Sequence, residues 1–144
     1  MAPQGPSRCC DSDIPCVFAK AMLSRNAECG LAERRAVGEQ MLLECPDAQA
    51  RGRCAELADL LHERARFALR LPPRTRPLMH MQALRLQCGG LQALRQQQGG
   101  ETRDVHAMVA AALNQHMTLQ DLPWAELVSA LAAWQAPQRG RPRS

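Results

Sequence analysis

Cysteine is the residue type in this sequence whose number and placement could support chemistry. Six of the seven cysteines lie in the first 54 of the 144 residues. Three of them adjoin a residue that breaks helices: Cys16 follows a proline, Cys29 precedes a glycine and Cys45 precedes a proline. Metal ligands are best placed where the backbone turns, because several side chains can then converge. The placement therefore favours a metal site in this part of the chain.

The candidate site consists of four cysteines separated by 12, 15 and 8 residues: Cys16, Cys29, Cys45 and Cys54. Each interval is long enough to hold a helix or a junction, so the four side chains can meet only through tertiary packing. Four thiolates suit either a 4Fe–4S cluster or a tetrahedral zinc ion. The closely spaced cysteine pairs of zinc ribbons and the ferredoxin run are absent. We favour the iron–sulfur cluster (4Fe–4S), because ligands at helix ends let backbone N–H groups point at the anionic sulfur, and keep zinc as the alternative.

The cysteines could also be buried thiols that bind no metal, or thiols that form redox pairs. Free cysteine is among the most buried residue types and packs as a small hydrophobe. Cys54 and Cys88 lie on apolar stripes where alanine would serve as well, and Cys88 is expected in the core. The adjacent pair Cys9 and Cys10 is interpreted as incidental. An odd cysteine count without a secretory signal argues against a disulfide framework.

Other motifs for chemistry are weak or absent. Histidines and methionines, such as Met79 to Met81, could bind Cu(I), but methionines at helical spacing usually fill cores. A pairing of Cys54 with His62 for nucleophilic catalysis would require a proximity that the sequence cannot reveal. The sequence contains no phosphate-binding glycine loop, zinc-protease motif or nucleophile elbow. Catalysis by the protein's own groups is therefore not expected.

The formal charge of +4 comes from an arginine-rich composition, with 17 arginines and one lysine. This bias toward arginine is a poor indicator of phosphate binding, so nucleic acid is not an expected partner. An arginine concentration over residues 64–85 could meet an acidic partner, although a solvated helical face is the simpler interpretation. The sequence has neither an apolar run that could span a membrane nor a signal peptide. A cytoplasmic location is expected.

Composition and periodicity predict an all-α fold, a compact bundle of five or six helices. Alanine, leucine, glutamine and arginine dominate, tyrosine is absent, and strand-forming residues are sparse. Helices are expected over 14–27, 31–44 and 46–71, from 78 through Gly89 and Gly90, over 102–116, and after Pro123. Residues 118–121 resemble a cap or single turn.

These elements predict a single helical domain over 13–135. Its cysteine-bearing half is 13–71 and its C-terminal helical half is 78–135. A flexible N-terminal segment, 1–12, and a basic tail, 136–144, flank it. We therefore predict a small soluble iron–sulfur protein acting in electron transfer, redox sensing or assembly as an accessory to a larger enzyme complex. A metal-free helical adaptor that docks a partner enzyme is the alternative, and a zinc-stabilised regulatory domain is a further one.

Overall fold

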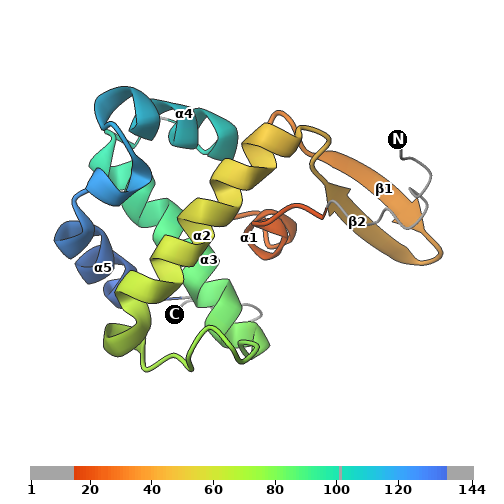
Figure 1. The fold of residues 1–144 in the computed structure, drawn as a ribbon. Helices are drawn as coiled ribbons and strands as arrows, with labels where there is room; N and C mark the ends of the chain where they lie inside the picture. Colours follow the sequence, from red (N-terminus) through yellow and green to blue (C-terminus); the bar gives the residue numbers. More distant parts are fainter. Residues whose placement is uncertain (1–14, 101, 136–144) are drawn as a thin grey trace, which may run out of the picture.

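Figure 1 shows the fold of the chain in a computed structural model, which describes residues 15–100 and 102–135. The elements in chain order are α1 (Ala19–Leu23), β1 (Glu33–Val37), β2 (Gln40–Glu44), α2 (Ala48–Leu69), α3 (His80–Gln97), α4 (Val105–Gln115), the 3-10 turn η2 (Leu119–Asp121) and α5 (Trp124–Ala133). The fold is thus mostly helical but not strictly all-α. The expected flexible segment 1–12 and basic tail 136–144 lie outside the described residues. No helix in the described ranges is both long and apolar enough to cross a membrane.

The helix predicted over 31–44 is wrong, because this segment forms an antiparallel hairpin. β1 pairs with β2 from Glu33 opposite Glu44 to Val37 opposite Gln40. Gly38 begins the two-residue turn with a φ of +63°, a conformation that tight hairpin turns require and that glycine adopts at no steric cost. The hairpin projects from the helices (Figure 1), and every residue of β1 is exposed. Two of the apolar positions that suggested a helical stripe, Val37 and Met41, are exposed at 43% and 45%.

The first helix is also shorter than the predicted 14–27. Before it, the Cys16 N–H donates to the Leu43 carbonyl at 2.9 Å, so the chain there runs beside β2 and is not helical. After it, Arg25 adopts a left-handed conformation with a φ of 66°, which ends the helix. The remaining helix still anchors this region, because Ala21 and Met22 are buried in the core.

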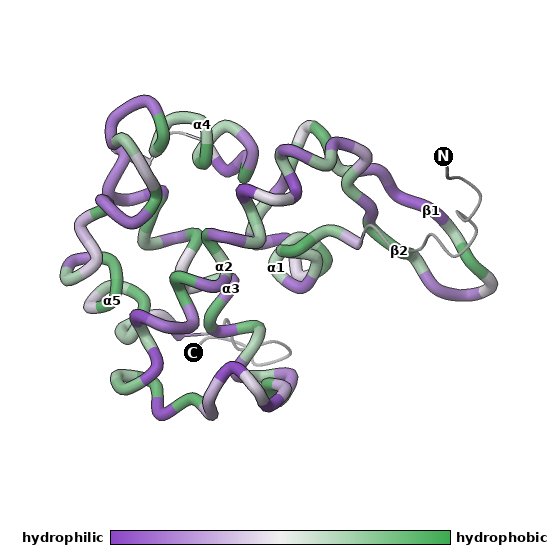
Figure 2. The backbone as a smooth tube through the Cα atoms, in the orientation of Figure 1, coloured by the Kyte–Doolittle hydropathy of each residue, from purple (hydrophilic) through white to green (hydrophobic). Residues whose placement is uncertain are grey.

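The two long helices match their predictions closely. In α2, the Asp47 side chain caps the first turn by accepting from the Ala50 N–H at 3.0 Å. The helix ends at Arg70 in a left-handed conformation. α3 continues through Gly89 and Gly90 without interruption, as predicted. Figure 1 shows α2 crossing in front of α3, and Figure 2 shows apolar and polar residues alternating along both.

The helices of the C-terminal half also form as predicted, with one correction at a cap. α4 is capped by Asp104, whose side chain accepts from the His106 and Ala107 N–H groups, and not by Thr102. The turn expected over 118–121 is confirmed as η2, where the Asp121 side chain accepts from the Thr118 N–H. α5 then packs along α3 and α2.

The two glycines of α3 allow its neighbours to approach closely. A Cβ placed on Gly90 would lie 2.7 Å from Cδ1 of Leu61 on α2, and one on Gly89 would lie 3.1 Å from Cβ of Trp134. Leu61 is itself buried, so it has little space to move aside. The close contact of Gly90 with α2 and that of Gly89 with Trp134 explain why glycines occupy a helix interior, where they otherwise cost about 1 kcal/mol.

Replacing Gly90 with alanine should therefore destabilise the protein. We expect Gly90→Ala to lower the free energy of unfolding by about 1 kcal/mol, because overpacking against Leu61 exceeds the gain in helix propensity. The matched control is Gly52→Ala in the exposed start of α2, where an added Cβ meets no atom within 4 Å. That variant should gain about 0.5–1 kcal/mol. Urea unfolding measures the free energy of unfolding of both variants. A Gly90→Ala protein as stable as the Gly52→Ala protein would contradict the close contact between Gly90 and Leu61.

Candidate metal centre

The four cysteines predicted as ligands line one cavity near the start of α2: Cys16, Cys29, Cys45 and Cys54. The rest of its wall is mostly apolar, formed by Val17, Met22, Leu31, Ala32, Ala50 and Val105, with Arg51 and His106 as the polar members. Segments far apart in sequence thus meet there, from the stretch before α1 to the first turn of α4.

Cys16 is held by the hairpin. Its N–H bonds to the Leu43 carbonyl, and the neighbouring Pro15 forms an isolated bridge with Glu44. The carbonyl of Cys16 accepts from the Ala19 N–H at 3.2 Å, at the entry to α1. These bonds tie the backbone on both sides of Cys16 to regular structure, which fixes the point from which its thiol extends.

Cys45 and Cys54 are placed by the junction between β2 and α2. Cys45 directly follows β2, is buried, and its Sγ donates to the Asp47 carbonyl at 3.5 Å. Cys54 lies in the second turn of α2, which Asp47 caps. The proline after Cys45 ends the strand, so the chain turns directly into the helix that carries the next thiol.

Cys29 is positioned by hydrogen bonds to the start of α4. The Glu28 N–H donates to the Arg103 carbonyl at 3.0 Å, and the Val105 N–H donates to the Glu28 carbonyl at 2.7 Å. On the other side of Cys29, the Gly30 N–H donates to Oδ2 of Asp104 at 3.2 Å. The same carboxylate caps α4 through Oδ1. Asp104 therefore joins the Cys29 loop to α4.

The cavity is narrow, with a volume of about 10 Å³. That is about enough for one water molecule. Across residues 15–100 and 102–135, no three histidine, cysteine or acidic side chains are grouped closely enough to hold a single metal ion. The four thiols thus line one cavity without forming such a group.

Burial and mutual repulsion keep two of the thiols protonated. Desolvation, together with the nearby thiols of Cys29 and Cys45, raises the pKa of Cys16 to about 11, although a hydrogen bond from the Phe18 backbone opposes this. Desolvation and the three other thiols raise the pKa of Cys54 to about 12. An acid is harder to ionise in apolar surroundings and beside other negative charges. A bound cation would reverse this balance, because metals bind the thiolate form.

These pKa values predict how the metal-free protein responds to alkali. An unfolded thiol loses its proton near the ordinary pKa of 9.0, whereas Cys16 and Cys54 keep theirs to about 11 and 12. The folded state then binds more protons than the unfolded state, so the free energy of unfolding should fall as pH rises above about 9. Urea unfolding across this pH range measures the slope. The double variant Cys16→Ala, Cys54→Ala should lose less stability per pH unit above pH 9 than the unaltered chain. An equal loss would contradict the raised pKa values of Cys16 and Cys54.

Sequence reasoning missed two polar residues of the cavity, Arg51 and His106. Arg51 precedes Cys54 by three residues on α2, so the helical period alone could have placed both on one face. Its Nε is buried and makes no hydrogen bond within the described part of the chain. His106 arrives through the bond between Glu28 and Val105, a contact that no local pattern reveals.

Two other candidate residues, Cys88 and His62, lie away from the cavity. Cys88 is 2% exposed in the core of α3, as expected, and its Sγ lies 3.6 Å from the Ser24 hydroxyl. Burial raises its pKa. His62 does not join Cys54; its Nε2 lies 2.9 Å from the Pro72 carbonyl oxygen, beyond the other end of α2. Cys9 and Cys10 lie outside the described residues.

The fold and the site thus define a small, mostly helical protein with a hairpin and a cavity lined by four thiols. No protein-family model matches the chain. Comparisons with curated proteins and with solved structures also find no match.

Proposed function

We propose that the chain holds a 4Fe–4S cluster through Cys16, Cys29, Cys45 and Cys54. In this role it would serve a larger complex as an electron-transfer, redox-sensing or assembly accessory. The observation that carries the proposal is the meeting of four thiols, from four separate segments, at one mostly apolar cavity. Such a donor set fits the all-cysteine ligation of these clusters.

Packing alone does not account for four thiols at one place. A buried cysteine that serves only as a small hydrophobe needs apolar neighbours, which Cys88 and the four cavity cysteines all have. Placing thiols together so that the pKa values of Cys16 and Cys54 rise gives no packing advantage over alanine at each position. The grouping is useful when a cation converts the thiols to thiolates and neutralises their repulsion.

A 4Fe–4S cluster and a single zinc ion place different demands on the four thiols. One tetrahedral ion needs its ligands at bonding distance from a single point, whereas a cluster binds each thiolate through a different iron atom. The four thiols share one cavity but are not grouped for one ion within residues 15–100 and 102–135. Because the cavity is narrow, uptake of a cluster requires some outward movement of its walls.

The polar surroundings of the cavity suit an anionic group. Thiolate-ligated clusters carry negative charge, and the permanently charged Arg51 has a buried Nε–H free of any partner in the described structure. The cavity also adjoins the start of α2, where the helix dipole is positive. Arg51 would thus supply a charge-assisted hydrogen bond next to the thiolates.

The chain's own residues would set how the cluster behaves. Cluster chemistry itself is one-electron exchange. Apolar side chains such as Val17 and Val105 exclude water from the cavity. Cys45 is buried, while Cys16, Cys29 and Cys54 are half-buried, so the site lies close to the surface. A shallow site of this kind leaves a short path to a partner.

The test is anaerobic reconstitution of the full chain with iron and sulfide. We expect the broad visible absorbance of a cluster and about four irons and four sulfides per chain. A colourless protein that binds one zinc ion would contradict the cluster and leave a zinc-stabilised domain. A chain that takes up neither metal would overturn the metal centre and leave the helical adaptor.

A further inference from the structure

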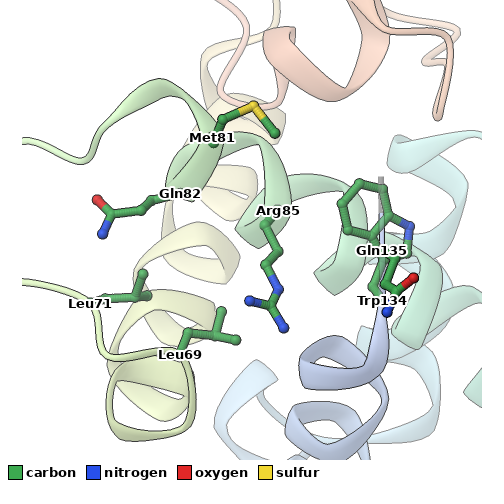
Figure 3. A pocket seen from close by; sticks show the side chains of 7 residues that line it. All are labelled: Leu69, Leu71, Met81, Gln82, Arg85, Trp134 and Gln135. Atoms are coloured by element: carbon green, nitrogen blue, oxygen red, sulfur yellow. The ribbon is translucent and has the colours of Figure 1, made fainter. Parts of the chain in front are cut away.

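A second site lies at the opposite end of α2 from the four thiols. An open groove of about 460 Å³ runs between the end of α2, the start of α3 and the residues after α5. Its apolar walls are Leu69, Leu71, Met81 and Trp134, and its polar members are Gln82, Arg85 and Gln135. Figure 3 shows Arg85 extending across the groove between the leucines and Trp134.

Arg85 is held in place by one hydrogen bond, but another of its donor nitrogens makes none. Its Nη2 donates to the Ala132 carbonyl at 2.6 Å, which fixes the guanidinium between α3 and α5. Its Nε is buried and makes no hydrogen bond within residues 15–100 and 102–135. A buried donor without an acceptor is costly, and a carboxylate is the acceptor that best matches the guanidinium fork. The groove therefore favours an occupant that brings a carboxylate.

The segments that lead into the groove are rich in arginine and carry exposed apolar side chains. Residues 63–85 contain six arginines and one acidic residue. Asp59 pairs with one of these arginines, Arg74. The same segments expose large apolar side chains: Phe67 is 85% exposed, Met79 72%, and Met81, which lines the groove, 58%. Exposed apolar groups rimmed by charge of one sign mark a binding surface for a partner of opposite charge.

We propose that this groove docks a segment of an acidic partner protein. The segment would place aliphatic or aromatic side chains against Leu71 and Trp134 and a carboxylate beside Arg85. A second copy of the chain would bring the same positive charges to the surface. Residues 136–144 contain three arginines and no acidic residue, so this segment would also bring positive charge to Arg85. The proposal does not depend on a bound metal.

The test uses a displayed library of short random peptides selected on the full chain. The matched variant is Gln82→Glu, which adds a negative charge inside the groove. A glutamate at this position can still accept from the Met79 N–H, as Oε1 of Gln82 does at 2.9 Å, and it suits the first turn of α3. The variant should therefore fold with unchanged or higher thermal stability. Gln120→Glu makes the same charge change at an exposed position before α5 and serves as the control.

We expect the selected peptides to combine acidic with aliphatic or aromatic residues. Fluorescence anisotropy should show that Gln82→Glu and Arg85→Gln each weaken their binding about tenfold or more. Gln120→Glu should change it by less than about twofold. The proposal is overturned if no peptide is enriched, if enriched peptides lack carboxylates, or if Gln82→Glu binds them like the unaltered chain. Self-association through the groove, seen by sedimentation and abolished by Gln82→Glu, would also overturn it.

Discussion

Serine at Cys16, Cys29, Cys45 or Cys54 should abolish or severely reduce iron binding. A hydroxyl at these positions stays protonated and is a poor ligand for iron, so each variant would leave a cluster with an open position. Loss of the metal should also loosen the cysteine-bearing half, because binding free energy that a site supplies contributes to folding. Iron content, visible absorbance and hydrogen exchange of residues 15–54 measure both effects.

Cys88→Ser is the matched control for these variants. Cys88 is also buried, but it lies in the core of α3 with the Ser24 hydroxyl at 3.6 Å and not in the cavity. We expect it to lose some stability while keeping its full iron content. Cys9→Ser and Cys10→Ser should keep iron as well. Equal loss of iron at Cys88 and at the four cavity positions would refute the assignment of ligands.

The second large effect is expected at Asp104, which binds no metal in the proposed site. Its Oδ1 caps α4 and its Oδ2 accepts from the Gly30 N–H next to Cys29. Asp104→Asn can retain the cap, because asparagine is a good N-cap residue, but an amide nitrogen in place of Oδ2 cannot accept from Gly30. We expect iron or zinc affinity to fall about 10–100-fold, the usual cost of losing a group that supports a ligand.

Competition with a chelator measures this affinity, and urea unfolding measures the stability of the same proteins. Asp104→Ala should add the loss of the cap, about 1 kcal/mol, to the loss of affinity. Asp121→Ala removes a comparable bond at η2, where the Asp121 carboxylate accepts from the Thr118 N–H, and serves as the control. It should lower stability without changing metal affinity. An Asp104→Asn protein with unchanged affinity would show that the Cys29 loop holds its position without this bond.

Local sequence patterns were sufficient for the long helices. α2 and α3 each carry apolar residues at helical spacing over several turns, and Asp47 marks the start of α2. The same reasoning failed for 31–44, because a short amphipathic segment fits a helix and a hairpin equally well. What decides between them is Gly38 at the turn and the pairing of Cys16 with Leu43, a contact across 27 residues.

The candidate site was predictable only in part, because it also depends on contacts between residues far apart in the sequence. Proline or glycine beside Cys16, Cys29 and Cys45 placed these residues at junctions, and the structure does bring them to one cavity with Cys54. Their convergence depends on the hairpin, which the helical period did not predict. His106 depends on the bonds that tie the Cys29 loop to α4, and these are visible only in three dimensions.

The 22 residues of α2 span about 33 Å from the thiol cavity to the groove that Arg85 lines. If a partner protein binds at the groove, the end of α2 that carries the thiols would therefore lie at a fixed distance from that partner and point away from it. Such an arrangement leaves that end accessible to a third molecule while the first stays bound. The chain would then act as a rigid spacer that holds the thiol cavity, and any group bound in it, at a fixed distance from the partner protein.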